Sequence, residues 1–275
     1  MIWMGRVYRF SDILPILALS LLPFAYSPER EIGTLAIDIL ISFFALSFAF
    51  SINDLFDSRI TGERNEIGRF SGIYGRLPGI SLSALPAFLS ILLAALFGIP
   101  PLAMGALLAF LLVFFLYSAE FPRARDYPGL DFVFNILGYF LILAKSHLMH
   151  FKALSDGLPG LLASSVFLIS FCAVAEAIHE LAHEREDRAS GRKTLFALLG
   201  RKGAVLLGIV LVPLPVLFLP VYGFWHTGTC VLFSALRLSR VISCRGASRD
   251  YSSLRKRLFG REELLIHLAL FLIGG

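Results

Sequence analysis

Charged residues are scarce in this chain: they make up 16% of its 275 residues, whereas 57% of the residues are hydrophobic. A typical soluble domain carries about 25% charged residues, so the composition excludes an ordinary soluble protein. Cysteine is also rare, with three residues and no CxxC pair, which excludes a disulfide framework and a cysteine-rich zinc cluster. The sequence has no glycine-rich phosphate loop and no nucleophilic serine elbow, so the usual signatures of nucleotide-binding enzymes and serine hydrolases do not apply.

Long apolar runs dominate the chain instead. A transmembrane helix needs about 20 predominantly apolar residues, and nine segments are candidates: residues 11–27, 34–52, 80–99, 101–117, 130–148, 158–178, 203–219, 221–243 and 262–275. No long linker or low-complexity tract separates them, so we expect one domain over residues 1–275. The sequence therefore predicts an all-α integral membrane protein, built as a bundle of nine transmembrane helices.

Basic residues are distributed unevenly between the loops. In the nine-helix register, 22 of the 25 Lys and Arg residues fall on one membrane face. Cytoplasmic loops retain positive charge, so we predict a multi-pass protein of the cell membrane, in contact with membrane lipids, whose N-terminus and active site face the cytoplasm. The net charge of +5 then reflects topology and does not indicate a nucleic-acid partner. Lys145, near the far end of the fifth span, is expected to anchor that span at the interface.

The second span ends in a cluster of polar residues, SINDLFDSRITGERN at residues 51–65. If the helix continues past the membrane edge, Asn53, Asp57 and Thr61 lie on one face, and Asp54 lies three residues before Asp57. Unpaired carboxylates near hydrocarbon are costly, so the cluster calls for a cation or a basic partner. Oxygen ligands suit Mg²⁺, which typically bridges carboxylates to substrate phosphates. The alternative is an ordinary solvated helix end.

A second acidic cluster follows the sixth span, in EAIHELAHEREDRASGRKT at residues 176–194. Helical spacing places its acids and histidines on two adjacent stripes: Glu176, Glu180 and Glu184 on one, and His179, His183 and Asp187 on the other. Both clusters emerge on the same membrane face, and arginine is suited to bidentate contacts with phosphate. Two acidic patches surrounded by basic residues would hold a metal-bridged diphosphate. The basic candidates are Arg69, Arg123, Arg125, Arg188, Arg192 and Lys193.

These motifs resemble those of the UbiA superfamily of intramembrane prenyltransferases, which join a polyprenyl chain from its diphosphate to an acceptor within the bilayer. NDLFDSRIT, from Asn53, looks like the first Asp-rich motif of the family, NDxxDxxxD, and DRASGRKT, from Asp187, looks like the DRxxGxxT end of the second. Residues 117–139, YSAEFPRARDYPGLDFVFNILGY, are similar to the YSAPPxRxKxRPGLDxxxN pattern of the carotenoid branch, such as lycopene elongases. Arg9, in YRFSDILP of the first span, is a fourth point of resemblance.

The resemblance implies a helical bundle around a central apolar chamber, and it assigns roles to residues of the motifs. Catalytic roles fall to Asp54, Asp57, Tyr117 and Asp187. Binding of the polyprenyl diphosphate falls to Arg9, Arg69, Arg123, Arg125, Asn135, Arg188 and Lys193. The ligands of Mg²⁺, or of Mn²⁺, would be Asn53, Asp57, Glu180, His183 and Asp187. This chain departs from the family pattern at Thr61 and His183, where the family usually has aspartate. Histidine is a poorer magnesium ligand than a carboxylate.

The implied reaction begins with loss of the diphosphate, stabilised by the metal and the arginines, to give an allylic carbocation. Aromatic faces such as Tyr117 or Tyr139 would stabilise the cation, and a lipophilic acceptor would attack it. Two other functions stay open. His179, Glu180 and His183 also spell HExxH, the motif of zinc metalloproteases, although this function leaves residues 53–61 and 117–139 unexplained. The third is a non-catalytic isoprenoid-binding relative or a transporter.

Overall fold

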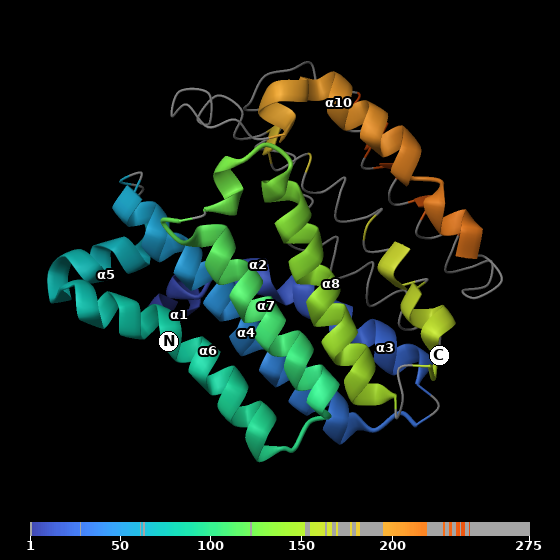
Figure 1. Ribbon diagram of the computed structural model, residues 1–275, viewed down its shortest axis with the longest axis horizontal. Coiled ribbons are helices and arrows are strands. Elements are labelled where there is room, and N and C mark those ends of the chain that lie inside the picture. The colour runs from blue at the N-terminus through green and yellow to red at the C-terminus, as the bar shows by residue number, and fades with distance from the viewer. Residues whose placement is uncertain are drawn as a thin grey trace.

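The computed structural model describes most of the first three-fifths of the chain and selected parts of the rest. The described residues are 2–27, 29–60, 62, 64–121, 123–151, 155–162, 164–166, 169, 177, 180–181, 195–218, 228, 231–232, 235–236, 238–239 and 242. Within these residues every regular element is a helix, which confirms the all-α prediction (Figure 1). The structural statements that follow concern this part of the chain.

The elements follow one another as helices of very different length. They are α1 (Ile2–Val7), α2 (Phe10–Leu17), η1 (Ala18–Ser20), α3 (Leu21–Tyr26), α4 (Ile32–Ile60), α5 (Glu66–Tyr74), α6 (Arg76–Leu96), α7 (Pro101–Ser118), η2 (Ala124–Asp126), α8 (Leu130–His150), α10 (Leu195–Leu211) and η3 (Leu214–Phe218). Four of them, α4, α6, α7 and α8, are long and apolar enough to cross a membrane. They match the predicted spans at 34–52, 80–99, 101–117 and 130–148.

The remaining spans do not all follow the prediction. The first span is broken into α2, the 3₁₀ turn η1 and α3. Pro23 accounts for the break, because it has no N–H to bond to the carbonyl one turn earlier and it lies in the first turn of α3, where a missing N–H costs least. The seventh span corresponds to α10, which is kinked at Gly200, just before the expected start at residue 203, and ends before Pro213. The spans at 158–178, 221–243 and 262–275 lie mostly or wholly outside the described residues, so the total of nine remains a prediction.

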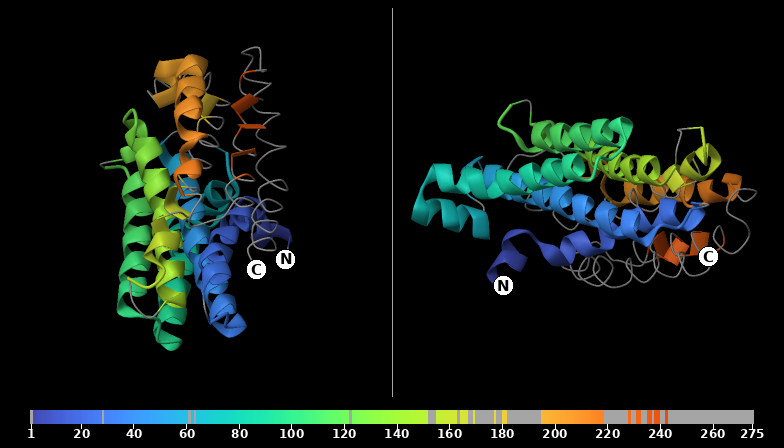
Figure 2. Two further views of the ribbon diagram at one scale, coloured as in Figure 1. Left: turned by 90° about the vertical axis from the view of Figure 1, so that its right-hand side faces the viewer. Right: turned by 90° about the horizontal axis from the view of Figure 1, so that it is seen from below.

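Helix α4 is the central element of the bundle. It packs against α2, α5, α6, α7 and α8, and Figure 2 shows α7 and α8 side by side next to it. Many side chains at these contacts are apolar and fully buried, among them Ile41 and Ala45 of α4, Leu107 and Phe110 of α7, and Ile142 of α8. The outer faces of α6 and α7 carry exposed apolar side chains instead. Such a surface suits lipid, because water is absent from the bilayer core.

Local contacts fix where the chain leaves α4. Asn65 caps the start of α5, since its Oδ1 accepts a hydrogen bond from the Gly68 amide at 2.7 Å. The Asn65 Nδ2 atom donates to the Asp54 carbonyl, also at 2.7 Å, and so ties the cap to α4. Position 68 requires glycine for steric reasons, because a Cβ atom there would lie 2.5 Å from the Ser58 Cβ atom. The end of α4 that carries the polar cluster is therefore held firmly against α5.

Candidate active site

Helix α4 continues to Ile60 and carries the first polar cluster on its last two turns. The predicted common face is confirmed for two residues, because the Asn53 Nδ2 atom donates to the Asp57 Oδ2 atom at 3.1 Å. Asp54 is 4% exposed and Asp57 is 3% exposed. A solvated helix end would leave these carboxylates in water, so that alternative is wrong. Thr61 lies outside the described residues.

Arg9 holds the first aspartate of the cluster. It lies between α1 and α2, and its Nε and Nη2 atoms donate to the two carboxylate oxygens of Asp54 at 3.1 and 2.5 Å. The guanidinium also lies over the Phe50 ring, 5.8 Å from the ring centroid. Arg9 has a φ of 48°, a left-handed conformation that is uncommon outside glycine. The N-terminal segment thus bends sharply where this arginine meets α4.

Arg123 holds the second aspartate. Its Nη2 atom lies 3.2 Å from the Asp57 Oδ1 atom, and its Nε atom lies 3.0 Å from the Asp126 Oδ2 atom. The guanidinium is buried between these two carboxylates. Arg123 directly precedes η2 and has a φ of 42°. Among the described residues, Arg9 and Arg123 are the two non-glycine residues with a positive φ. Strained backbone of this kind concentrates at functional sites.

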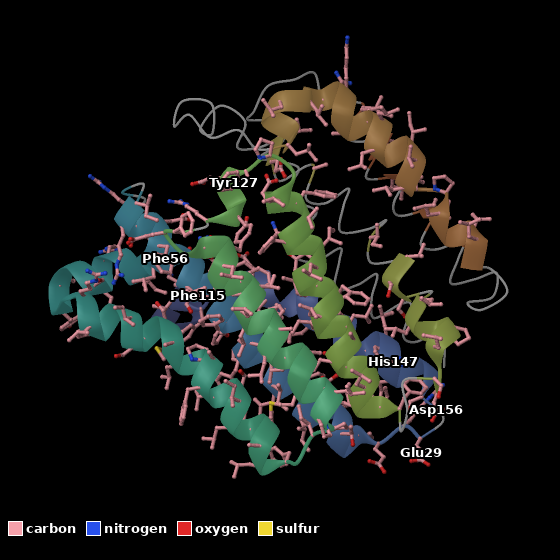
Figure 3. All side chains as sticks on the ribbon, in the orientation of Figure 1. Glu29, Phe56, Phe115, Tyr127, His147 and Asp156 are labelled. Carbon is pink, nitrogen blue, oxygen red and sulfur yellow. The ribbon has the colours of Figure 1, made fainter. Side chains whose placement is uncertain are left out.

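Aromatic side chains from α4 and α7 lie beside the polar cluster. The Phe56 and Phe115 rings meet edge to face with centroids 6.3 Å apart, and Figure 3 labels both, together with Tyr127 on the loop between α7 and α8. Tyr117 is half-buried on α7, and its hydroxyl accepts a hydrogen bond from Asn135 Nδ2 of α8 at 3.3 Å. Two predicted site residues, Tyr117 and Asn135, are therefore in contact across neighbouring helices.

The start of α8 brings in the described part of the second acidic cluster. Asp131 and Glu180 are each 4% exposed. The Asp131 carboxyl lies near Glu180 and near the Leu195 backbone at the start of α10, but neither of its oxygens forms a hydrogen bond within the described residues. Two buried carboxyl groups in contact are costly unless a cation or a proton lies between them. This contact places Glu180 against α8, which begins directly after the loop that carries Arg123.

Several predicted site residues are not part of this described cluster. Arg69 lies on the surface of α5, with a side chain that is 71% exposed and 3.6 Å from Glu66. The side chain of Arg125 and the residues His179, His183, Glu184, Asp187, Arg188, Arg192 and Lys193 lie outside the described residues. Within the described part, no three His, Cys, Asp or Glu side chains are grouped to hold a metal ion. Of the predicted metal ligands, Asn53 and Asp57 lie together there, joined through the Asn53 Nδ2 atom.

A model of the UbiA prenyltransferase family matches residues 13–269 of the chain. The chain belongs to the UbiA prenyltransferase family. A comparison with curated proteins gives no significant match. The UbiA assignment covers almost the whole chain, so the protein is an integral membrane protein of an intramembrane prenyltransferase class. The carotenoid branch, in contrast, stays a prediction.

Solved structures share the UbiA fold over their full length. A UbiA homologue from Archaeoglobus fulgidus bound to GPP and Mg²⁺ is 15% identical, with a TM-score of 0.74 and coverage of 98% of this chain and 99% of that one. A structure concerning digeranylgeranylglyceryl phosphate synthase is 18% identical, with a TM-score of 0.67 and coverage of 100% and 99%. A UbiA homologue from Aeropyrum pernix K1 in its apo form is 17% identical, with a TM-score of 0.62 and coverage of 98% and 96%. At these identities the likeness establishes the fold.

A second polar cluster of this UbiA protein lies at the opposite end of α4 and α8. Lys145 is fully buried and donates to the Asp38 carboxylate and, at 2.6 Å, to the Ser42 hydroxyl. The Ser20 hydroxyl lies 3.1 Å from those of both Ser42 and Ser146, which joins η1 to the same network. The expectation that Lys145 is an interfacial anchor is wrong, because an acid on the neighbouring helix neutralises it inside the bundle. Asp38, an acid within an apolar run, was the signal that could have revealed this pair.

Proposed function

We propose that this protein transfers a polyprenyl group from its diphosphate to a lipophilic acceptor, at the end of the bundle where α4 ends and α8 begins. The observation that carries this proposal is the pairing of the two buried aspartates of NDLFD, each with its own arginine: Asp54 with Arg9, and Asp57 with Arg123. Buried carboxylates and guanidinium groups at one site are suited to a ligand that brings both anionic oxygens and cations. A prenyl diphosphate with its metal ions is such a ligand.

The residues present fit a hard divalent cation. The side chains of Asn53 and Asp57 lie on one face of α4, where Asp57 offers carboxylate oxygens, and the carboxyl groups of Asp131 and Glu180 lie near each other. Mg²⁺ or Mn²⁺ is bound by such oxygens together with substrate phosphates. When bound, the cation would neutralise charge on the departing diphosphate. We include His183 and Asp187 among the proposed ligands on the basis of the motif alone.

The side chains of the protein would perform the remaining steps. Arg123 donates to diphosphate oxygens, and Arg9, Arg69, Arg125, Arg188 and Lys193 are proposed to assist. The C–O bond of the prenyl diphosphate breaks with its electron pair leaving on the diphosphate. The Tyr117 ring, oriented by Asn135, stabilises the allylic cation. A π-electron pair of the acceptor then forms the new C–C bond, and the acceptor loses a proton. Apolar helices around a central chamber exclude water from the cation.

Orientation, domain extent and acceptor belong to the same proposal. The contacts of Arg9 and Arg123 with α4 lie at one end of the bundle, which supports a cytoplasmic site under the positive-inside rule. The family match over residues 13–269 supports one prenyltransferase domain over residues 1–275. The pattern at 117–139 favours an apolar, carotenoid-like acceptor embedded among membrane lipids.

The test is a prenyl transfer assay with purified protein, labelled geranylgeranyl or farnesyl diphosphate, and a membrane lipid extract. We expect a labelled lipid product that requires Mg²⁺ and disappears in Asp57→Ala. Glu31→Gln, an exposed substitution near the start of α4, is the control and should retain activity. Binding of the diphosphate without product under any divalent metal would instead indicate a non-catalytic relative. The protease alternative would prevail if Asp57→Ala were active while Glu180→Gln abolished cleavage of a membrane peptide by zinc-loaded protein.

A further inference from the structure

We infer that the polar network at the far ends of α4 and α8 is a second ligand site, which binds the hydroxyl group of a long isoprenoid acceptor. The centre of this site is the gap between the Asp38 carboxylate and the His150 ring. The inference rests on the proposed function, because the acceptor would extend from this gap to the diphosphate at the other end of the bundle. Neither Asp38 nor His150 belongs to the motifs that carry the proposed reaction.

Two buried polar atoms lie on either side of the gap without bonding to each other. The Asp38 Oδ2 atom is 3.7 Å from the His150 Nε2 atom, beyond the range of a hydrogen bond. Neither atom has a hydrogen-bond partner within the part of the chain that the structure describes. The two side chains are 0% and 1% exposed, so bulk water does not reach them. Because buried polar atoms are nearly always hydrogen-bonded, the gap calls for a ligand or an ordered water.

The other polar groups of the network are already used, which leaves the gap as its open position. Lys145 donates to the Asp38 Oδ1 atom, to the Asp38 carbonyl at 3.2 Å and to the Ser42 hydroxyl at 2.6 Å. These are the three donors that a lysine has. The Ser146 hydroxyl also donates to the Asp38 Oδ1 atom, at 3.1 Å. A further group can therefore bind at the Oδ2 atom without displacing these contacts.

His150 is held in place from the α3 side. Its ring meets the Phe24 ring edge to face, with centroids 5.7 Å apart. Its carbonyl accepts a hydrogen bond from the Ser27 hydroxyl, at the end of α3, at 3.2 Å. The His150 ring is thus fixed by packing, and its Nε2 atom stays directed at the same side of Asp38.

Charge and hydrogen bonding define the chemical class of the ligand. Lys145 neutralises Asp38, so an added cation would be repelled by the lysine and an added anion by the carboxylate. Within the described residues no three His, Cys, Asp or Glu side chains are grouped to hold a metal ion. A neutral hydroxyl fits, because its oxygen accepts from the His150 N–H while its proton is donated to Asp38.

One stripe of buried residues on each helix joins this gap to the candidate active site. The stripes are Asp38, Ser42, Ala45 and Ala49 on α4, and Asn135, Ile142 and Ser146 on α8. Fifteen residues separate Asp38 from Asn53, and fifteen separate Asn135 from His150, a length of about 22 Å on either helix. The middle of both stripes is apolar. This arrangement suits a long hydrocarbon chain with a hydroxyl at the Asp38 end and its reacting double bond at the diphosphate end.

The experiment asks whether purified protein in nanodiscs retains phytanol in preference to phytane, two isoprenoid chains that differ only by a terminal hydroxyl. The probes are added at equal concentration, and the bound ratio is measured by mass spectrometry against empty nanodiscs. We expect wild type to favour phytanol about ten-fold, the size of a hydrogen bond to a charged group.

Substitutions of His150 locate the preference. His150→Phe keeps a ring beside Phe24 but removes the Nε2 atom, so the preference should be lost. His150→Gln retains an N–H at a similar position and should keep most of it. Glu31→Gln, an exposed substitution near the start of α4, is the control and should behave as wild type does. If His150→Phe does not fold, His150→Leu provides the same comparison.

Other sites of binding give different results. A preference that disappears in Asp57→Ala but persists in His150→Phe would place the hydroxyl in the candidate active site and overturn the inference. Equal retention of both probes by wild type would overturn it as well, because the gap then holds ordered water only. If that result came with normal prenyl transfer, the proposed function would stand. A preference for phytanol without transfer under any divalent metal would overturn the proposed function and leave a site for isoprenoid alcohols.

Discussion

Asp38 and Lys145 form an ion pair between α4 and α8 in which both side chains are fully buried. Ser42 and Ser146 add hydrogen bonds to the pair, and the His150 Nε2 atom lies 3.7 Å from the second carboxylate oxygen. Figure 3 labels His147 in the same part of α8, away from Tyr127, which lies on the loop just before the start of that helix. A buried pair of this kind stabilises little in net terms, but loss of one partner leaves an uncompensated charge.

Lys145→Met should therefore destabilise the protein strongly. We expect a loss of about 3–5 kcal/mol, the usual cost of breaking a buried ion pair by removing one partner, measured as a lower unfolding temperature in detergent. The double variant Asp38→Leu with Lys145→Met should recover much of the loss, because both charges are then gone. Lys202→Met removes an exposed lysine of α10 and is the matched control, with no expected change. Equal stability of Lys145→Met and wild type would contradict the role of the pair.

Local patterns in the sequence were sufficient to predict the helix that carries the site. The apolar run from residue 34 and the helical spacing of Asn53 and Asp57 predicted that α4 continues past its apolar part, and it does. These features depend on the period of one helix, which the sequence contains directly. The grouping of arginines with acids at one end followed from the loop charges. The loop charges did not predict which arginine pairs with which acid, that is, Arg9 with Asp54 and Arg123 with Asp57.

The remaining features depend on contacts between distant segments. Lys145 was assigned to the interface because it lies near the far end of its span. Its partner, Asp38, precedes it by 107 positions, so the pattern of one helix could not reveal the pair. Asp126 gave no signal, since an acid that follows arginines in a loop is most often solvated. Its position follows from the 3₁₀ turn after Arg123, and that turn depends on a positive φ that the sequence pattern does not predict for arginine.

Two substitutions at Arg9 separate the effect of its left-handed backbone conformation on stability from the effect of its guanidinium charge on activity. Arg9→Ala and Arg9→Gly both remove the guanidinium, so both should reduce prenyl transfer to a similar low level. Glycine adopts a φ of 48° without penalty, whereas alanine does not, so Arg9→Gly should be more stable by about 1 kcal/mol. The measurement is thermal unfolding beside the transfer assay. At Arg6, within helix α1, the order of stability should be reversed: Arg6→Gly should be less stable than Arg6→Ala, because glycine destabilises a regular helix.

Substitutions at Tyr117 separate the contribution of its ring to kcat from that of its hydroxyl, which accepts the hydrogen bond from Asn135. If the ring face stabilises the carbocation, Tyr117→Phe keeps that interaction and should retain kcat within about three-fold, whereas Tyr117→Leu should lower kcat about ten-fold. KM should change little in either variant, because the cation forms only after the diphosphate has bound. Phe88→Leu, an exposed aromatic of α6, is the control and should leave kcat unchanged. Equal kcat values for the Phe and Leu variants would argue against a cation-stabilising ring.

The close packing of α7 against α8 sets the position of the loop that carries Arg123, and Gly138 tests it. A Cβ atom at this position would lie 2.3 Å from the Phe114 Cε2 atom, so Gly138→Ala must push the helices apart. Overpacking of this kind costs about 1–3 kcal/mol, and we expect a lower unfolding temperature together with weaker prenyl diphosphate binding. Adding Phe114→Leu removes the clashing ring edge and should restore both. Gly105→Ala meets no atom within 4 Å and should be neutral or slightly stabilising in the same helix pair. If Gly138→Ala behaved like Gly105→Ala, contact between α7 and α8 would not control the site.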